Sequence, residues 1–376
     1  MRQFALAVTF LLCARAAEHK AIIPANGAKP GGPYSPGVLA GGHLYVAGQG
    51  GRSGQGVMPP DFAGQARQAL ENVRLIVEAG GLTMQQVVYS QVFLTDIRNV
   101  APLDKVWHEV FPANPPARAV IGVAALPIGL VQINAVAATR PEHNAAGVRS
   151  GERLFLNSIH AGTTEKAILQ LSKVLQSSGL GLEHLAFVNV YIDPTISYQE
   201  MNAIYGRHFE KGNAPARATY TVAQLPDGAH IAITGVAVTD LRLRKVIRPR
   251  NMPPSNTSSP CVWAGETLYC SSKSGFIPGI NGGIWEQTVE GQVRQSFRNL
   301  LDGLEEAGLN LSHAVASTVA LDQTADFATM NGTYAKYFDS TPPARTTIQP
   351  AAPVDRKANA AGQWPKLEEI AIVAVR

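Results

Sequence analysis

The hydrophobic and polar positions along the chain repeat one order of elements three times. Each repeat predicts a short hairpin, an amphipathic helix, a β-rich strand, a second helix and a closing hairpin of two strands. The opening hairpins are expected in residues 39–46, 149–156 and 263–270. The first helices are expected in residues 61–79, 163–177 and 286–306, with Asp61 and Thr163 as N-caps of the first two. The β-rich strands are expected in residues 87–96, 185–193 and 314–322, and the last strands in residues 130–138, 230–238 and 366–375.

This order of elements predicts an α+β fold in which one face of each sheet is covered by two helices. The breaks between repeats predict three tandem domains, at residues 21–140, 147–240 and 253–376. The second domain is degenerate, because it lacks the glycine-rich insertion that the other two carry after their first hairpin.

The tripeptide Pro-Ala-Arg marks the same place in every repeat. Its three copies lie at residues 116–118, 215–217 and 343–345, and each arginine begins a strand-like run. The pattern therefore predicts a repeated cation at a repeated strand start.

Composition narrows the class of protein. The 376 residues are 45% hydrophobic, which predicts globular domains with real cores. The formal charge of +4 falls to +2 if residues 1–17 are removed, because Arg2 and Arg15 are lost with them. Such a weak bias argues against nucleic acid or an anionic membrane as the partner.

Residues 1–17 have a basic start, an apolar run and small residues near the end, which predicts an export signal and a periplasmic or secreted protein. The alternative is a terminal extension or a misassigned start, which would leave the protein cytoplasmic. No other segment has the length of apolar sequence that a membrane span requires. The nine histidines and the cysteines show no metal-ligand spacing, so neither a metal nor a cofactor is expected.

Cys261 and Cys270 flank a predicted two-residue turn at Gly265-Glu266, which would place the two cysteines opposite each other. Directly opposed residues in a hairpin lie near the separation that a disulfide needs. A disulfide and a pair of buried thiols are equally compatible with this pattern.

Five motifs in the first repeat resemble the RidA family, also called YjgF/YER057c/UK114. They are Gly32-Pro33-Tyr34-Ser35-Pro36, Tyr45-Val46-Ala47-Gly48-Gln49, Gln68-Ala69-Leu70-Glu71-Asn72-Val73, Val92-Phe93-Leu94-Thr95-Asp96 and Pro116-Ala117-Arg118. The resemblance implies a chorismate-mutase-like fold, and single-domain members of the family form homotrimers with clefts between subunits. We therefore expect the three copies to form an intramolecular pseudo-trimer, so that the chain acts as a monomer.

The resemblance also implies a chemistry. In the family, the matching arginine binds the carboxylate of an imine or enamine, which water hydrolyses to a 2-keto acid and ammonia. This role would fall to Arg118, Arg217 and Arg345, with Tyr34, Gly48 and Gln49 lining a cleft. A packing role for Tyr34 is an equal alternative.

A glutamate on the last strand is proposed to act in hydrolysis in active relatives. Counting along the last strand puts Asn134 at that position in the first repeat, Thr234 in the second and Ile370 in the third. Glu368 and Glu369 lie beside Ile370, and the sequence leaves open which of them faces a cleft. We therefore expect catalysis to involve Arg118 or Arg345 with Glu368 or Glu369, and Asn134 to contribute to binding.

Three functions are compatible with these features. The first is hydrolysis of small carboxylate-bearing imines by a deaminase-type reaction. The second is non-catalytic binding of small carboxylates, which the loss of glutamate from two repeats favours. Endoribonuclease activity, ascribed to some relatives, is a weaker third because the sequence has no basic stripe with stacking aromatics.

Overall fold

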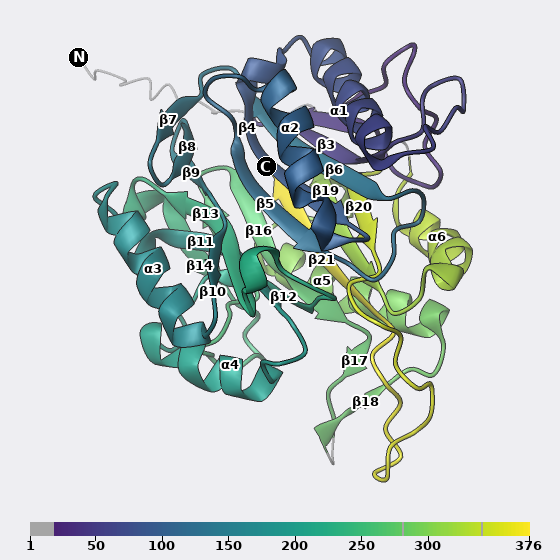
Figure 1. The fold of residues 1–376 in the computed structure, drawn as a ribbon. Coiled ribbons are helices and arrows are strands. Elements are labelled where there is room, and N and C mark those ends of the chain that lie inside the picture. Colours follow the sequence, from purple (N-terminus) through teal and green to yellow (C-terminus); the bar gives the residue numbers. More distant parts are fainter. Residues whose placement is uncertain (1–18, 280–281, 340) are drawn as a thin grey trace, which may run out of the picture.

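The computed structural model describes residues 19–279, 282–339 and 341–376, so the expected signal in residues 1–17 lies outside the described part. The described chain forms three mixed β-sheets, one for each repeat, and every sheet carries two α-helices on one face (Figure 1). The α+β class and the three tandem domains are therefore confirmed.

The strands of each domain form one sheet of six or seven strands. In domain 1 they are β1 (Lys20–Ile22), β2 (Gly37–Ala40), β3 (His43–Gly50), β4 (Val87–Leu94), β5 (Ala117–Gly122) and β6 (Val131–Ala138). In domain 2 they are β7 (Glu142–Asn144), β8 (Gly147–Ser150), β9 (Arg153–Leu156), β10 (Ile159–Ala161), β11 (Leu185–Ile192), β12 (Ala216–Thr221) and β13 (Ile231–Val238). In domain 3 they are β14 (Arg244–Ile247), β15 (Cys261–Ala264), β16 (Thr267–Ser274), β19 (Ala314–Leu321), β20 (Ala344–Ile348) and β21 (Glu368–Val375). A separate two-stranded sheet, β17 (Phe276–Ile277) with β18 (Ile284–Trp285), projects from domain 3 (Figure 1).

The α-helices come in pairs that pack on the outer face of each sheet. They are α1 (Phe62–Ala79) and α2 (Val100–Val110), α3 (Thr164–Gln176) and α4 (Tyr198–Tyr205), and α5 (Val289–Glu306) and α6 (Phe327–Tyr334). The first helix of every pair begins behind a capping side chain, since Asp61, Thr163 and Thr288 each accept a backbone N–H three residues further on. The expected caps Asp61 and Thr163 are thus confirmed, and the third helix starts at Val289 rather than 286 because Thr288 is its cap.

The closing strands do not form the expected hairpin. In domain 1, β5 pairs in parallel with β4, whereas β6 lies between β3 and β4 and is antiparallel to both. The other two domains repeat this order. The reason is that β5 follows helix α2, and a strand–helix–strand connection favours a parallel pair. The expected hairpin was wrong because alternation along a strand does not reveal its partner.

Two strands occupy segments that the sequence suggested were linkers. Strand β7 pairs with β8, and β14 pairs with β15 at the edge of the third sheet. The third sheet therefore begins at Arg244, before the predicted boundary at 253.

The inner faces of the three sheets share one hydrophobic core, to which all three domains contribute. At one place in this region a buried arginine of domain 2 joins the other two domains. Arg153 Nη1 donates to the hydroxyls of Tyr45 in domain 1 and Tyr269 in domain 3, at 3.2 and 3.0 Å. Its Nη2 lies 2.5 Å from His43 Nδ1, and burial together with the charge of Arg153 lowers the pKa of His43 to about 3. A neutral His43 can therefore accept the arginine's hydrogen bond.

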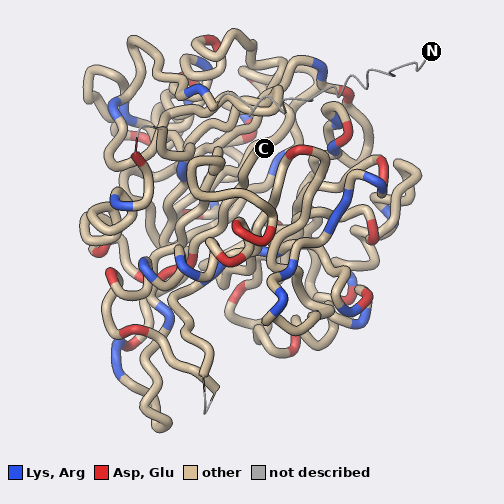
Figure 2. The backbone as a smooth tube through the Cα atoms, turned by 180° about the vertical axis from the view of Figure 1, so that it is seen from behind, with Lys and Arg blue, Asp and Glu red and all other residues tan. Residues whose placement is uncertain are grey.

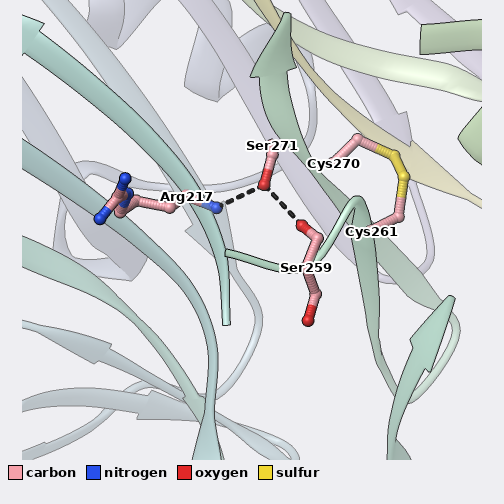
Figure 3. The surroundings of a disulfide bond; sticks show 5 residues. All are labelled: Arg217, Ser259, Cys261, Cys270 and Ser271. Carbon is pink, nitrogen blue, oxygen red and sulfur yellow. Dashed lines mark hydrogen bonds between the residues drawn. A yellow bond between two sulfur atoms is a disulfide. The ribbon is translucent and has the colours of Figure 1, made fainter. Parts of the chain in front are cut away.

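The predicted register of the third hairpin is confirmed. Cys261 pairs with Cys270, and their sulfur atoms form a disulfide of 2.00 Å (Figure 3). Gly265 adopts a φ of 64° in the turn between them, a conformation that glycine accepts without strain. The disulfide therefore closes a hairpin whose geometry already brings the two cysteines together.

Acidic and basic residues are interspersed along the backbone in the view of Figure 2. Among the helices of the described residues, none is long and apolar enough to cross a membrane.

Candidate functional site

The start of the strand at each Pro-Ala-Arg motif contacts the first hairpin of another domain or a residue next to that hairpin. Three hydrogen bonds mark these contacts: Ser158 N to Arg118 O at 3.2 Å, Arg217 N to Ser271 Oγ at 2.8 Å, and Ser35 N to Pro343 O at 3.3 Å. Domain 1 thus contacts domain 2, domain 2 contacts domain 3, and domain 3 contacts domain 1. A cleft beside any one arginine is consequently built from two domains.

Arg345 is a buried cation without an anionic partner among the residues that the structure describes. Arg345 is only 2% exposed, and its Nη2 donates to the amide oxygen of Asn331 at 2.6 Å. The guanidinium carbon lies 5.2 Å from the ring centre of Tyr34 and 4.7 Å from that of Tyr334. Within the described residues, no carboxylate lies within salt-bridge distance of it. Burial lowers the pKa of Arg345, but a guanidinium stays charged at neutral pH.

Domain 1 supplies the opposite wall of the Arg345 cleft. A cavity of about 220 Å³ is lined by Arg345 together with Tyr34, Gly48, Gln49 and Gln132. A β-bulge in β3 lies just before Gln49 and shifts the register of this strand at the cavity wall. The structure therefore brings the predicted residues Tyr34, Gly48 and Gln49 together with Arg345, and it adds Gln132.

Gly32 allows the domain 1 backbone to lie directly on this arginine. A Cβ at position 32 would come within 2.7 Å of Arg345 Nη2 and 2.8 Å of the Asn331 amide. A side chain there would have to displace these groups, so the glycine allows the close approach seen in the structure.

Two polar atoms of the Arg345 cleft are buried and lack a hydrogen-bond partner among the described residues. They are Gln132 Oε1 and Arg345 Nε. Unsatisfied buried polar atoms are rare in folded proteins and costly. One donor and one acceptor in the cleft therefore remain free for a ligand or water.

Arg217 resembles Arg345 in its immediate contacts. Its Nη2 donates to Asn202 Oδ1 at 2.6 Å, its guanidinium lies 4.8 Å from the ring centre of Tyr205, and the residue is 5% exposed. Across the domain boundary, Ser271 Oγ accepts the Arg217 backbone N–H and donates to Ser259 O at 2.6 Å (Figure 3). Domain 3 thus fixes the start of the Arg217 strand.

Arg118 differs because its charge is already neutralised. Its Nη2 forms a salt bridge of 2.6 Å with Asp104, and its side chain is 24% exposed. The guanidinium also lies 4.9 Å from the ring centre of Trp107. Asp104 lies on the second helix at the position where the other two domains have Asn202 and Asn331. This position therefore determines whether the arginine forms a salt bridge or bonds only to a neutral amide.

The two glutamates of β21 face opposite sides of the third sheet. Glu368 points toward α5, where its Oε1 accepts from Ser296 Oγ at 2.5 Å. Burial raises the pKa of Glu368 to about 8. Glu369 points to the other side, where Ser272 Oγ and Lys366 Nζ donate to its carboxylate, the latter at 2.6 Å. Ser272 follows Ser271, which contacts Arg217, so Glu369 lies at the boundary that holds Arg217 rather than Arg345.

The register corrects the position of the predicted hydrolytic residue. Asn134 pairs with Gln91, and the corresponding residues of the other domains are Thr234 and Ala371, not Ile370. Glu369 therefore corresponds to Gln132, two residues before Asn134. The error arose because the third strand was counted one residue out.

Asn134 itself lies away from the Arg345 cavity. Its Nδ2 donates to Gln91 Oε1 at 2.9 Å and to Thr346 Oγ1 at 3.0 Å, and it lines a separate cavity of about 100 Å³ at the centre of the three sheets. Gln132, Asn202 and Asn331 were not among the residues predicted from the sequence. Their signal was available only by aligning the repeats helix by helix and strand by strand.

No group of three or more His, Cys, Asp or Glu side chains among residues 19–279, 282–339 and 341–376 is arranged to hold a metal ion.

Comparison with known proteins agrees with the repeat structure. The family model described as Endoribonuclease L-PSP matches residues 25–139, 146–239 and 250–358. A RutC family protein of Pyrococcus horikoshii is 37% identical over 120 residues, which are 31% of this chain and 94% of that protein. Two solved structures from E. coli each align with 32% of this chain and 99% of their own, at a TM-score of 0.31. They are the YjgF gene product, 36% identical, and TdcF with bound serine, 34% identical.

The family model covers most of the chain, in three successive matches that each overlap one of the three sheets. The chain therefore belongs to the RidA family, the Endoribonuclease L-PSP family of the matching model, and contains three tandem copies of its domain.

Proposed function

We propose that the Arg345 cleft binds a small molecule that carries a carboxylate, of the imine, enamine or 2-keto acid class. Membership of the RidA family supports a general role in imine deamination or small-molecule binding. The observation that carries the proposal is the buried guanidinium of Arg345, which lines a cavity and, among the described residues, donates to the Asn331 amide oxygen and the Met330 sulfur but to no carboxylate. A buried charge without a counter-ion is unfavourable, and an anionic ligand would supply the missing charge.

The remaining wall of the cleft suits the rest of such a ligand. A carboxylate can accept two parallel N–H bonds from a guanidinium. Gln132 and Gln49 offer amide groups to the keto oxygen or imine nitrogen, and Tyr34 offers an aromatic face. The side chain of Gln132 is an amide and not a carboxylate, so it cannot accept a proton from water. This cleft therefore favours binding over hydrolysis.

A second function, hydrolysis, is favoured at the Arg217 boundary by Glu369. Its carboxylate is oriented by Ser272 and Lys366. In this proposal Glu369 takes a proton from water as the water oxygen bonds to the imine carbon. The proton then passes to the nitrogen, which gives a carbinolamine. The remaining hydroxyl proton moves to the nitrogen as the C=O bond forms and the carbon–nitrogen bond breaks, so a 2-keto acid and ammonia leave. Binding of RNA relies on clustered basic residues that contact its phosphates. Acidic and basic residues are interspersed in Figure 2, which does not support endoribonuclease activity.

The three domains are further proposed to act as an intramolecular trimer, so that one chain is the functional unit. The closed order of contacts from domain 1 to 2, 2 to 3 and 3 to 1 supports this arrangement. Light scattering should give the mass of a single chain, and a particle of three chains would contradict the proposal.

Binding is tested by calorimetric titration of 2-oxobutanoate into the full chain and into Arg345→Met, Arg217→Met and Arg118→Met variants. Loss of a charged hydrogen bond costs about 1.5–3 kcal/mol, so Arg345→Met should weaken binding by roughly 10- to 100-fold. Arg118→Met is the matched control and should bind as the wild type does, because its guanidinium is already paired with Asp104. Unchanged binding by a folded Arg345→Met variant would refute the proposal.

Hydrolysis is tested separately by generating 2-aminoacrylate in situ and following its decay. Acceleration that is lost in Glu369→Gln and Arg217→Met, but kept in Arg345→Met, would assign catalysis to the Arg217 boundary. Decay no faster than in buffer would leave the protein as a binder.

A further inference from the structure

We propose that the ligand of the Arg345 cleft carries two acidic groups, as a 2-keto dicarboxylate does. This inference rests on the proposed function, because it assigns the first carboxylate to Arg345. It goes further by assigning the second acidic group to the mouth of the same cavity.

The charges around the cavity have one sign. Its lining includes the three cations Arg345, Arg52 and Lys29, and none of the described residues that line it is an aspartate or glutamate. Arg345 is buried, whereas Arg52 and Lys29 are exposed. The cavity therefore has one cation in its wall and two at its solvent side, and a ligand with a single carboxylate would engage only the first.

The backbone that carries Arg52 is held in place from helix α1. The side-chain amide of Asn72 donates to the carbonyl oxygens of Gly50 and Arg52, at 2.9 and 2.8 Å. These bonds fix the strand end beside the cavity, so the arginine projects from a positioned segment although its side chain reaches solvent.

In domain 3 an asparagine holds the corresponding backbone in the same way, but the residue that it positions is different. Asn299 donates to the carbonyl oxygens of Ser274 and Phe276, at 3.0 and 2.9 Å. Phe276 therefore stands where Arg52 stands in domain 1, and its ring packs 4.9 Å from that of Trp285. The same backbone position presents a cation at the Arg345 cleft and an aromatic pair in domain 3, which makes the second cationic site particular to one cleft.

Exposed cations interact weakly with a ligand, because water and salt screen them. Two of them acting on one acidic group should nonetheless make a dianion bind about tenfold more tightly than a matched monoanion at low salt. The ratio of the two affinities should fall toward one near 1 M salt, where the screening length is about 3 Å.

The test compares three probes by calorimetry on the full chain. They are 2-oxobutanoate with one carboxylate, 2-oxoglutarate with two, and phosphoenolpyruvate with a carboxylate and a phosphate. Tighter binding of 2-oxoglutarate supports the proposal as stated. If only phosphoenolpyruvate binds more tightly, the second group is a phosphate and the dicarboxylate assignment is overturned.

The double variant Lys29→Gln/Arg52→Gln should lose the roughly tenfold preference for 2-oxoglutarate and keep the affinity for 2-oxobutanoate. Arg242→Gln removes a surface cation whose side chain is 90% exposed and which does not line the cavity, and it serves as the control. Equal affinity of the wild type for all three probes overturns this inference alone, provided that 2-oxobutanoate binding depends on Arg345. If that binding does not depend on Arg345, the proposed function fails as well.

Discussion

Gln132 and Glu369 occupy the same register position on the closing strands of domains 1 and 3, yet they lie at different clefts. Gln132 lines the cavity of Arg345, whereas Glu369 is bonded to Ser272 at the boundary that holds Arg217. The carboxylate of domain 3 is thus separated from the arginine of its own domain. The separation arises because each cleft lies between two domains, so that the arginine of domain 3 faces domain 1 while its glutamate faces domain 2.

Replacing Gln132 by glutamate should add a proton acceptor to the cleft that holds Arg345 and Tyr34. General-base groups contribute roughly 10²- to 10⁴-fold to such reactions. We therefore expect Gln132→Glu to give the Arg345 cleft a hydrolysis rate for 2-aminoacrylate at least about tenfold above buffer, and this added rate should be lost when Arg345→Met is combined with it. The new carboxylate should also compete with ligands for Arg345 and weaken 2-oxobutanoate binding.

The control for this variant is Gln132→Leu, which removes the amide without adding a base. Decay should not accelerate in it. Equal rates for the glutamate and leucine variants would show that position 132 does not face the reacting group.

Exchanging the helix residues that bond to Arg118 and Arg345 should exchange which of the two arginines can bind a ligand carboxylate. Asn331→Asp places a carboxylate where the amide oxygen now lies 2.6 Å from Arg345, so 2-oxobutanoate binding should weaken at least tenfold. Asp104→Asn removes the salt bridge of Arg118 and should add a weak binding event that the wild type lacks.

Asp104→Asn should change the free energy of unfolding by less than about 1 kcal/mol, because the pair is partly exposed. Titration stoichiometry and denaturant unfolding measure the two effects. A single binding event with unchanged affinity in both variants would contradict the assignment of the free arginine.

Glu368 should make stability depend on pH. Its folded-state pKa is raised to about 8 from an ordinary value of 4.5, so between these values the folded state binds more protons than the unfolded state. The stabilisation is complete below pH 4.5 and is lost as the pH rises through 8, by about 1.4 kcal/mol per unit of pKa difference at most.

Glu368→Gln should flatten this part of the stability profile, as measured by urea unfolding between pH 5 and about pH 9. Glu305→Gln changes an exposed glutamate of helix α5 in the same domain and should leave the slope as in the wild type. A slope that persists in Glu368→Gln would assign it to another group.

The disulfide should stabilise the third domain. Cys261 and Cys270 are nine positions apart, and closing so short a loop in the unfolded chain is worth about 2–3 kcal/mol. The Cys261→Ala/Cys270→Ala variant should lose about this much in denaturant unfolding. A reducing agent should lower the stability of the wild type and leave the variant unchanged; a wild type indifferent to reduction would contradict the bond's role.

The sequence by itself determined the features that depend on neighbours along the chain. The caps Asp61 and Thr163, and the opposition of Cys261 to Cys270, follow from spacing within one helix or one hairpin. The three repeats were visible because the same local order recurs. Family resemblance also named Arg345 and Tyr34, which the structure brings to one cavity.

Tertiary structure alone decided which residues meet across domains. It joined Arg345 to Gln132 and placed Glu369 at the Arg217 boundary, since each cleft combines a strand of one domain with a hairpin of another. It also showed that Asp104 neutralises Arg118. Three identical tripeptides thus acquire different chemistry, because the charge and polarity around an arginine depend on packing partners that spacing along the chain does not specify.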